Sequence, residues 1–122
     1  MSQVLNDTSR NGHAEVVKLL LADEIVDVNK VNYGIMDYGW TSLHATSFHG
    51  HAEVVKLLLD AGGIDVNKAD EDGWSSLHLA SQEGHAEVVE LLLADERVNV
   101  NKAKNNGWTS LHLASLRGKL RS

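Results

Sequence analysis

The sequence lacks proline and cysteine in all of its 122 residues. Without cysteine it can form neither disulfides nor thiolate metal sites. Without proline, its turns must depend on the 10 glycines and on Asn and Asp. No apolar run approaches the roughly 20 residues of a membrane-spanning helix, and no basic segment followed by an apolar stretch opens the chain. We therefore expect a soluble, cytoplasmic protein with no membrane partner.

Positive charge is also scarce. The chain has 11 Lys and Arg against 17 Asp and Glu, which gives a net charge of −6. Nucleic-acid binding usually requires clustered basic residues, so we expect no nucleic-acid partner. A basic or mixed-charge protein surface fits this charge better. The 43% hydrophobic content is typical of a folded domain.

Two phrases recur along the chain, Gly-Trp-(Thr/Ser)-Ser-Leu-His and Gly-His-Ala-Glu-Val-Val. A fixed period of 20–50 residues is typical of stacked repeat units, which offer an extended surface and no central cleft. The first phrase begins at Gly39, Gly73 and Gly107, and the second at Gly12, Gly50 and Gly84.

Each unit reads as helix, turn, helix and finger. Ser75 is the expected N-cap of a first helix, and Gly84 is expected to end it. A second helix is expected from His85 to Leu93, and the equivalent helix of the preceding unit leads into a polar finger over 64–73. We expect Val66 of the finger to be buried, and Val89, Leu92 and Leu93 of the second helix to be core residues.

The segment Ser-Ser-Leu-His-Leu-Ala, followed by Gly-His and a Val/Leu-rich helix, resembles the ankyrin repeat. The resemblance implies an all-α, ankyrin-type helix-turn-helix solenoid with short β-hairpin or finger loops. It also implies protein–protein recognition through a concave face of fingers and inner helices, with no catalysis and no cofactor. We expect a single ankyrin repeat domain over 1–122, with a degenerate first repeat at 1–36, repeats at 37–70 and 71–104, and a truncated repeat at 105–122.

The chain departs from the family pattern in several places. Serine replaces the family's proline at Ser42, Ser76 and Ser110, and the finger around 31–36 carries four extra residues. The first repeat has the polar run 6–9 where the others have His-Leu-Ala-Ser, which suits an end that faces water. The chain ends before a fourth second helix, so we expect Leu91 and Leu92 to be half covered and the open C-terminal face to mediate homo-oligomerisation.

The seven histidines do not indicate a metal site. His44, His78 and His112 stand in the signature motif, where the family uses the histidine to tie neighbouring repeats together. His49 breaks the repeat pattern, but it lacks the further ligands of a closed site. No phosphate-binding loop, His-Glu-x-x-His motif or nucleophile elbow is present, so we expect no catalytic residues.

A tryptophan follows the finger glycine in every complete unit. Three indoles at one register could form an aromatic strip that anchors a partner. They could equally pack across the finger bases and stiffen the stack, and the sequence leaves both interpretations open. The three are Trp40, Trp74 and Trp108.

Residues that differ between units are free to serve a partner, whereas identical ones serve the scaffold. The differing positions run from aromatic to acidic to basic along the repeats, although neutral variation of a solvated face would look similar. Together with the tryptophans, they give the partner-contact candidates Trp40, Trp74, Trp108, Tyr38, Phe48, His49, Glu71, Asp72, Glu83 and Lys104.

Two other functions remain open. The near-identical phrases also suit a structural or engineered array that self-associates and has no dedicated partner. Alternatively, the finger asparagines resemble those that asparaginyl hydroxylases modify in this family, which would make the chain a substrate. The asparagines concerned are Asn29, Asn67 and Asn101.

Overall fold

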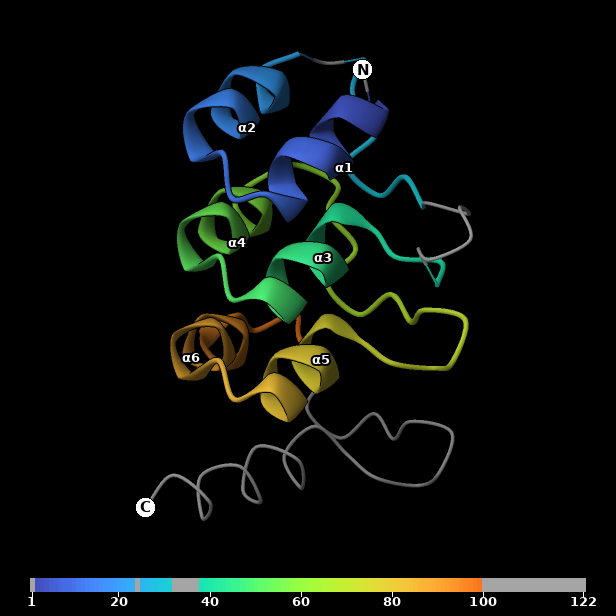
Figure 1. Cartoon of the computed structure of the whole chain (residues 1–122), viewed down its shortest axis with the longest axis vertical. Helices are drawn as coiled ribbons and strands as arrows, with labels where there is room; N and C mark the ends of the chain where they lie inside the picture. The colour runs from blue at the N-terminus through green and yellow to red at the C-terminus, as the bar shows by residue number, and fades with distance from the viewer. Residues whose placement is uncertain (1, 24, 32–37, 100–122) are drawn as a thin grey trace.

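The computed structural model describes residues 2–23, 25–31 and 38–99. Within these residues the chain forms helices and turns, and the fingers contain no β-strand. The helices are α1 (Ser2–Arg10), α2 (Ala14–Leu21), α3 (Ser42–His49), α4 (Ala52–Leu59), α5 (Ser76–Glu83) and α6 (Ala86–Ala94). They stand in two columns, an inner one of α1, α3 and α5 and an outer one of α2, α4 and α6 (Figure 1). The fingers extend from the inner column, as the solenoid prediction requires.

The inner helices begin and end as the sequence predicts. The hydroxyls of Thr41 and Ser75 accept the backbone N–H of His44 and His78, and each imidazole accepts the N–H of its cap residue in return. This reciprocal pairing is a capping box built with histidine. Gly84 ends α5 with φ 75°, a left-handed conformation that costs glycine little.

Each outer helix buries the side chains that face the helices of the adjacent repeats. In α4, between α2 and α6, Val54, Val55, Leu58 and Leu59 are all buried. In α6 the residues equivalent to Val54 and Leu58 are still buried, namely Val88 and Leu92.

Part of the core prediction for α6 was therefore wrong. Leu93 is 42% exposed and is not a core residue, and Val89 is only half-buried. Leu92 is completely buried, so it belongs to the core and is not half covered as the truncated C-terminus suggested; Leu91 is half-buried. The reason is the helical period: Val88 and Leu92 share the buried face of α6, whereas Val89 and Leu93 lie about 100° further round the helix, where Val89 only partly packs against the core.

The first repeat also differs from the expectation of a polar, water-facing end. Asn6 and Ser9 are buried, and Asn6 occupies the place of the signature histidine. Its side chain donates to the backbone carbonyl of Lys30 at 3.2 Å and accepts the hydroxyl of Ser42. Two residues of this run, Asn6 and Ser9, thus lie inside the stack, whereas Asp7 is exposed.

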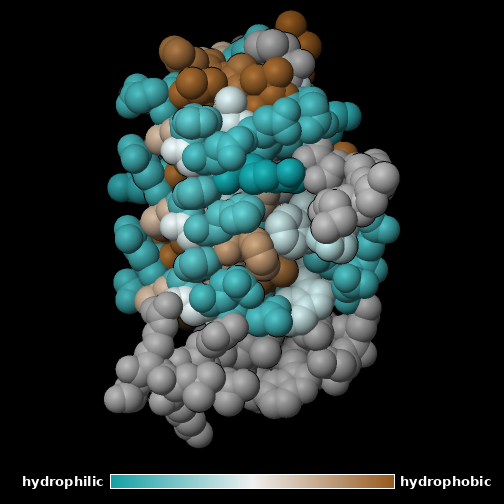
Figure 2. Space-filling view, viewed as in Figure 1, coloured by the Kyte–Doolittle hydropathy of each residue, from teal (hydrophilic) through white to brown (hydrophobic). Residues whose placement is uncertain are grey.

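Apolar side chains are instead exposed at this end, where hydrophobic residues gather over α1 and α2 (Figure 2). The exposed fractions reach 75% for Leu19 and 83% for Ile25, and Val4 and Val16 are also exposed. Val16 is equivalent to the buried Val54, which the preceding repeat covers. This end of the stack therefore presents a surface of the kind that repeats use against one another.

Finger asparagines join successive repeats. The Asn29 amide donates to the Gly63 carbonyl at 2.8 Å and accepts the N–H of Asp65 at 2.7 Å. Asn67 makes the same pair of bonds with Arg97 and Asn99 in the next repeat. Both ends of each amide are used, so the fingers stand at a fixed spacing.

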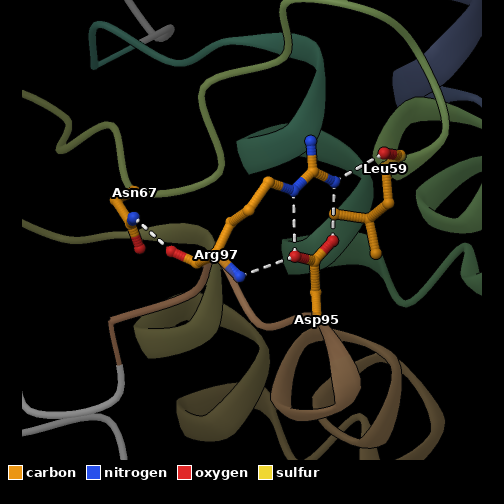
Figure 3. A network of polar contacts seen from close by, with 4 residues as sticks. All are labelled: Leu59, Asn67, Asp95 and Arg97. Atoms are coloured by element: carbon orange, nitrogen blue, oxygen red, sulfur yellow. Dashed lines mark hydrogen bonds and ion pairs between the residues drawn. The ribbon is translucent and has the colours of Figure 1, made fainter.

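Arg97 reinforces this joint at the end of α6. Its guanidinium pairs with Asp95 at 2.7 Å and donates to the Leu59 carbonyl at the end of α4, also at 2.7 Å. Figure 3 shows how this side chain bridges the two outer helices while its backbone carbonyl accepts Asn67. The equivalent position in the preceding repeat is Gly63, so within the described part of the chain this arginine bridge occurs only between α4 and α6.

Histidines of the Gly-His phrases make a second set of joints. His51 Nε2 lies 2.9 Å from the Arg10 carbonyl, and His85 Nε2 lies 2.8 Å from the Phe48 carbonyl. Each ring thereby satisfies the C-terminal end of the preceding inner helix. The sequence identifies His51 and His85 only as helix starts, but in the structure they connect successive repeats through hydrogen bonds.

Candidate functional site

Four of the predicted contact residues form a continuous row of rings, which we call the aromatic row: Tyr38, Trp40, Phe48 and His49. The finger supplies the first two, and the last turn of α3 supplies the other two. Ring centroids are 5.8 Å apart for Tyr38 and Trp40, 5.0 Å for Trp40 and Phe48, and 5.1 Å for Phe48 and His49. These tilted and edge-on geometries are favourable for aromatic pairs. The row is only partly covered, because Tyr38 is 46% exposed and His49 is exposed as well.

The backbone beneath the row is unusual. Tyr38 has φ 53°, the one positive φ of a non-glycine residue among those described, and Gly39 follows with φ 72°. A bulky residue in the left-handed region is strained and persists only where its surroundings hold it. The Tyr38 carbonyl accepts the N–H of Glu71 at 3.1 Å, which fixes this turn against the next finger. A Cβ at Gly39 would lie 2.8 Å from Glu71 Cγ, so the two fingers are in close contact.

Asp70 organises the site from the third repeat. One carboxylate oxygen accepts the backbone N–H groups of Asp72 and Trp74, at 2.9 and 2.8 Å. The other accepts the indole N–H of Trp40 at 2.9 Å. Asp70 thus shapes its own finger and sets the orientation of Trp40 in the preceding one.

The two described indoles have different surroundings. Trp40 packs on Phe48, whereas Trp74 meets the ring of His78 edge-on at 5.8 Å. The difference follows from the sequence, because Gln82 stands in the third repeat where Phe48 stands in the second. Trp40 therefore belongs to a surface row, and Trp74 lies against the capped start of α5.

Charges of opposite sign flank the row. Partial desolvation is the main cause that lowers the pKa of His49, although its side chain is exposed at one edge; the nearby His51 and Arg10 lower it further, and Glu83 opposes them. Arg10 ends α1 in the preceding repeat, and Glu83 ends α5 in the following one. Glu71 and Asp72 are exposed at the finger turn beside Trp40.

Two of the predicted residues, Trp108 and Lys104, lie outside the described residues. Sequence reasoning also missed two others, Asp70 and Arg10. An aspartate three residues before Gly-Trp was a usable signal for a side-chain-stabilised turn. The position of Arg10 beside His49 had no such signal, because it depends on how repeats stack.

The metal-ligating side chains of the described residues are scattered over the stack. No cluster of three or more His, Cys, Asp or Glu that could hold a metal ion occurs among them. One open groove of about 150 Å³ lies between the two fingers and includes Gly39, Lys68 and Glu71 in its lining. In the same part of the chain, every helix is too short or too polar to cross a membrane.

The family profile for ankyrin repeats in three copies matches residues 3–70 and 62–121. The chain therefore belongs to the ankyrin repeat family, as its motifs, paired helices and fingers indicate. No curated protein matches the sequence significantly. Ankyrin repeats generally mediate protein–protein interaction and form a typically non-catalytic module.

Asn29 and Asn67 have a clear structural role, because each amide bonds to the next repeat through both of its polar atoms. These hydrogen bonds explain why asparagine stands at both positions, so the recurrence of asparagine does not by itself indicate modification by a hydroxylase. The third asparagine of this set, Asn101, lies outside the described residues.

Proposed function

We propose that this chain binds a protein partner through the surface formed by its fingers and the ends of its inner helices, without catalysis. The aromatic row is the anchor, and Glu71, Asp72 and Glu83 form its charged border. Trp74, Trp108 and Lys104 extend the contact surface along the stack. The partner presents a basic or mixed-charge surface, and the complex forms in the cytoplasm.

One observation carries this proposal: three rings of the partly exposed row, Tyr38, Phe48 and His49, stand at positions where the repeats differ, and they adjoin Trp40. Phe48 and His49 have Gln82 and Glu83 as their counterparts, so neither ring is required by the repeat itself. Large aromatic side chains are enriched among the residues that dominate binding energy at interfaces. The capped helices and bonded fingers hold these rings in place before a partner arrives, which reduces the entropy lost on binding.

A displayed library of random peptides tests the proposal directly. We expect the intact chain to select peptides, and we expect Phe48→Gln to weaken their binding about tenfold or more, as for a buried interface aromatic. Glutamine is the residue that the third repeat carries at this position, so the variant should remain folded, with a melting temperature lowered only by the loss of the Trp40–Phe48 ring contact. The melting curve of Phe48→Gln therefore serves as the control for folding.

The control on the opposite side of the stack is Leu19→Gln, which removes an exposed apolar group from α2. Peptides that bind both variants equally well would contradict a site at the aromatic row. Trp74→Ala distinguishes the two interpretations of the indoles. If it lowers affinity more than stability, Trp74 is a contact; if it lowers only stability, the indole is structural.

A further inference from the structure

We propose that the aromatic row receives its partner in one fixed direction, with a basic side chain over the third repeat and an acidic one over the first. This inference rests on the proposed binding function and adds the chemistry and polarity of the bound segment. The occupant is an extended peptide segment with an apolar centre and opposite charges at its two ends.

Electrostatics give the direction. His49 is the last ring of the row and lies near Arg10 from the first repeat and Glu83 from the third, which have opposite effects on its pKa. The two groups lie at neighbouring positions of the repeat, since Arg10 is equivalent to Phe48 and Glu83 is equivalent to His49, and each is the last residue of its inner helix. The row therefore stands between a positive end and a negative end.

The negative end is available to a partner. Among the described residues, the carboxylates of Glu71, Asp72 and Glu83 have no ion-pair partner. Asp70 is different, because its oxygens already hold Trp40 and the finger turn. A cationic side chain that lies over this end would meet unpaired carboxylates beside the exposed edge of the row, where ring faces also attract cations.

The spacing of the charges follows from the stack. Packed helices lie about 8–10 Å apart, so the ends of α1 and α5 are separated by about two such steps, or roughly 20 Å. An extended chain rises about 3.3 Å per residue, so its two charges should stand about six residues apart. The apolar residues between them would lie on Trp40 and Phe48.

Charge reversal in the intact chain tests this inference on the peptides selected above. We expect the double variant Glu71→Lys/Glu83→Lys to weaken binding of the original peptides about tenfold, because attraction becomes repulsion at a partly exposed rim. A new selection on this variant should return peptides with an acidic residue at that end. Arg10→Glu should change the preference at the other end in the opposite sense.

The matched control is Glu87→Lys/Glu90→Lys, which changes net charge equally on outer helix α6 and should leave affinity within about twofold. Melting curves show whether each variant remains folded. The variant Glu71→Gln/Glu83→Gln removes the two negative charges without introducing positive ones. Peptides that require Phe48 but ignore the charge reversal would overturn the fixed direction alone. Peptides that ignore Phe48 as well would overturn the proposed binding site itself.

Discussion

At the scale of single residues, glycine and histidine act as pairs. Gly12 and Gly50 have φ near 75°, and the imidazole of the next repeat fills the space where a side chain would begin. A Cβ at Gly50 would lie 2.6 Å from His85 Nδ1. The recurrence of Gly-His in the sequence thus records a contact between repeats, not only a turn within one.

We predict that Gly50→Ala lowers the free energy of unfolding by at least about 1–2 kcal/mol, from the left-handed backbone alone. Displacement of His85 would add to this loss. Gly62→Ala is the control, because a Cβ there meets no atom within 4 Å. Urea denaturation of both variants checks the prediction, and equal stability of the two would contradict it.

His44 couples stability to pH. Burial lowers its pKa below the usual 6.5, against the opposing effect of Asp70. Its Nε2 lies 3.2 Å from the Trp74 carbonyl oxygen. Because a carbonyl can only accept a hydrogen bond, Nε2 carries the proton. Nδ1 is then unprotonated and accepts the backbone N–H of Thr41. Protonation of Nδ1 would break the capping box.

Because the folded pKa lies below the unfolded value, the neutral form is favoured in the fold and the unfolded chain binds more protons. The stabilisation is complete above pH 6.5 and is lost as pH falls below that value. We predict that His44→Asn, which copies Asn6 of the first repeat, flattens the decline of melting temperature between pH 7 and 5. His13→Asn, at an exposed position, should leave the decline unchanged; identical profiles for both variants would exclude His44 as a source.

At the scale of elements, the short inner helices depend on their ends. Each has only eight or nine residues, too few to be stable alone in water. The capping boxes and the left-handed glycines at the helix ends provide stability that such short helices lack by themselves. Serine at the first helical position is the weak point, since proline would fix φ there.

We predict that Ser76→Pro raises the free energy of unfolding by about 0.5–1 kcal/mol, through lower entropy of the unfolded chain. The preceding residue, Ser75, has φ −91° and ψ 170°, a conformation that proline allows. Ser42→Pro is the informative comparison, because it also removes the hydroxyl that donates to Asn6. A melting temperature for Ser76→Pro below that of the parent chain would show that the ring does not fit.

At the scale of the whole molecule, helices α2 and α4 have identical sequences in different environments. Both read Ala-Glu-Val-Val-Lys-Leu-Leu-Leu, yet Val54 is buried while its counterpart Val16 is 42% exposed. Among the described elements, α4 has an outer helix on both sides, whereas α2 has one only on the side of α4. The exposed apolar side chains of α1 and α2, Val4, Val16 and Leu19, therefore form a candidate surface for self-association.

We predict concentration-dependent self-association of the intact chain, measured by light scattering. Leu19→Glu should weaken it about tenfold or more, since burying one leucine contributes about 1.5–3 kcal/mol. Leu93→Glu tests the C-terminal flank in the same way. A parent chain that stays monomeric at high concentration would rule out both faces.

The sequence by itself determined the family, the order of helices and fingers, the caps and the glycine stops, because these follow from local chemistry repeated at a fixed period. It also singled out the residues of the aromatic row, Trp40 because it recurs in every complete unit and Tyr38, Phe48 and His49 because they differ between units. The tertiary structure decided which flank of each outer helix is covered, that Asn6 replaces a histidine inside the stack, and that Asp70 orients Trp40. The physical reason is that burial and hydrogen-bond partners of a stacked repeat come from its neighbours, about 34 residues away in the chain, and a unit read alone carries no record of them.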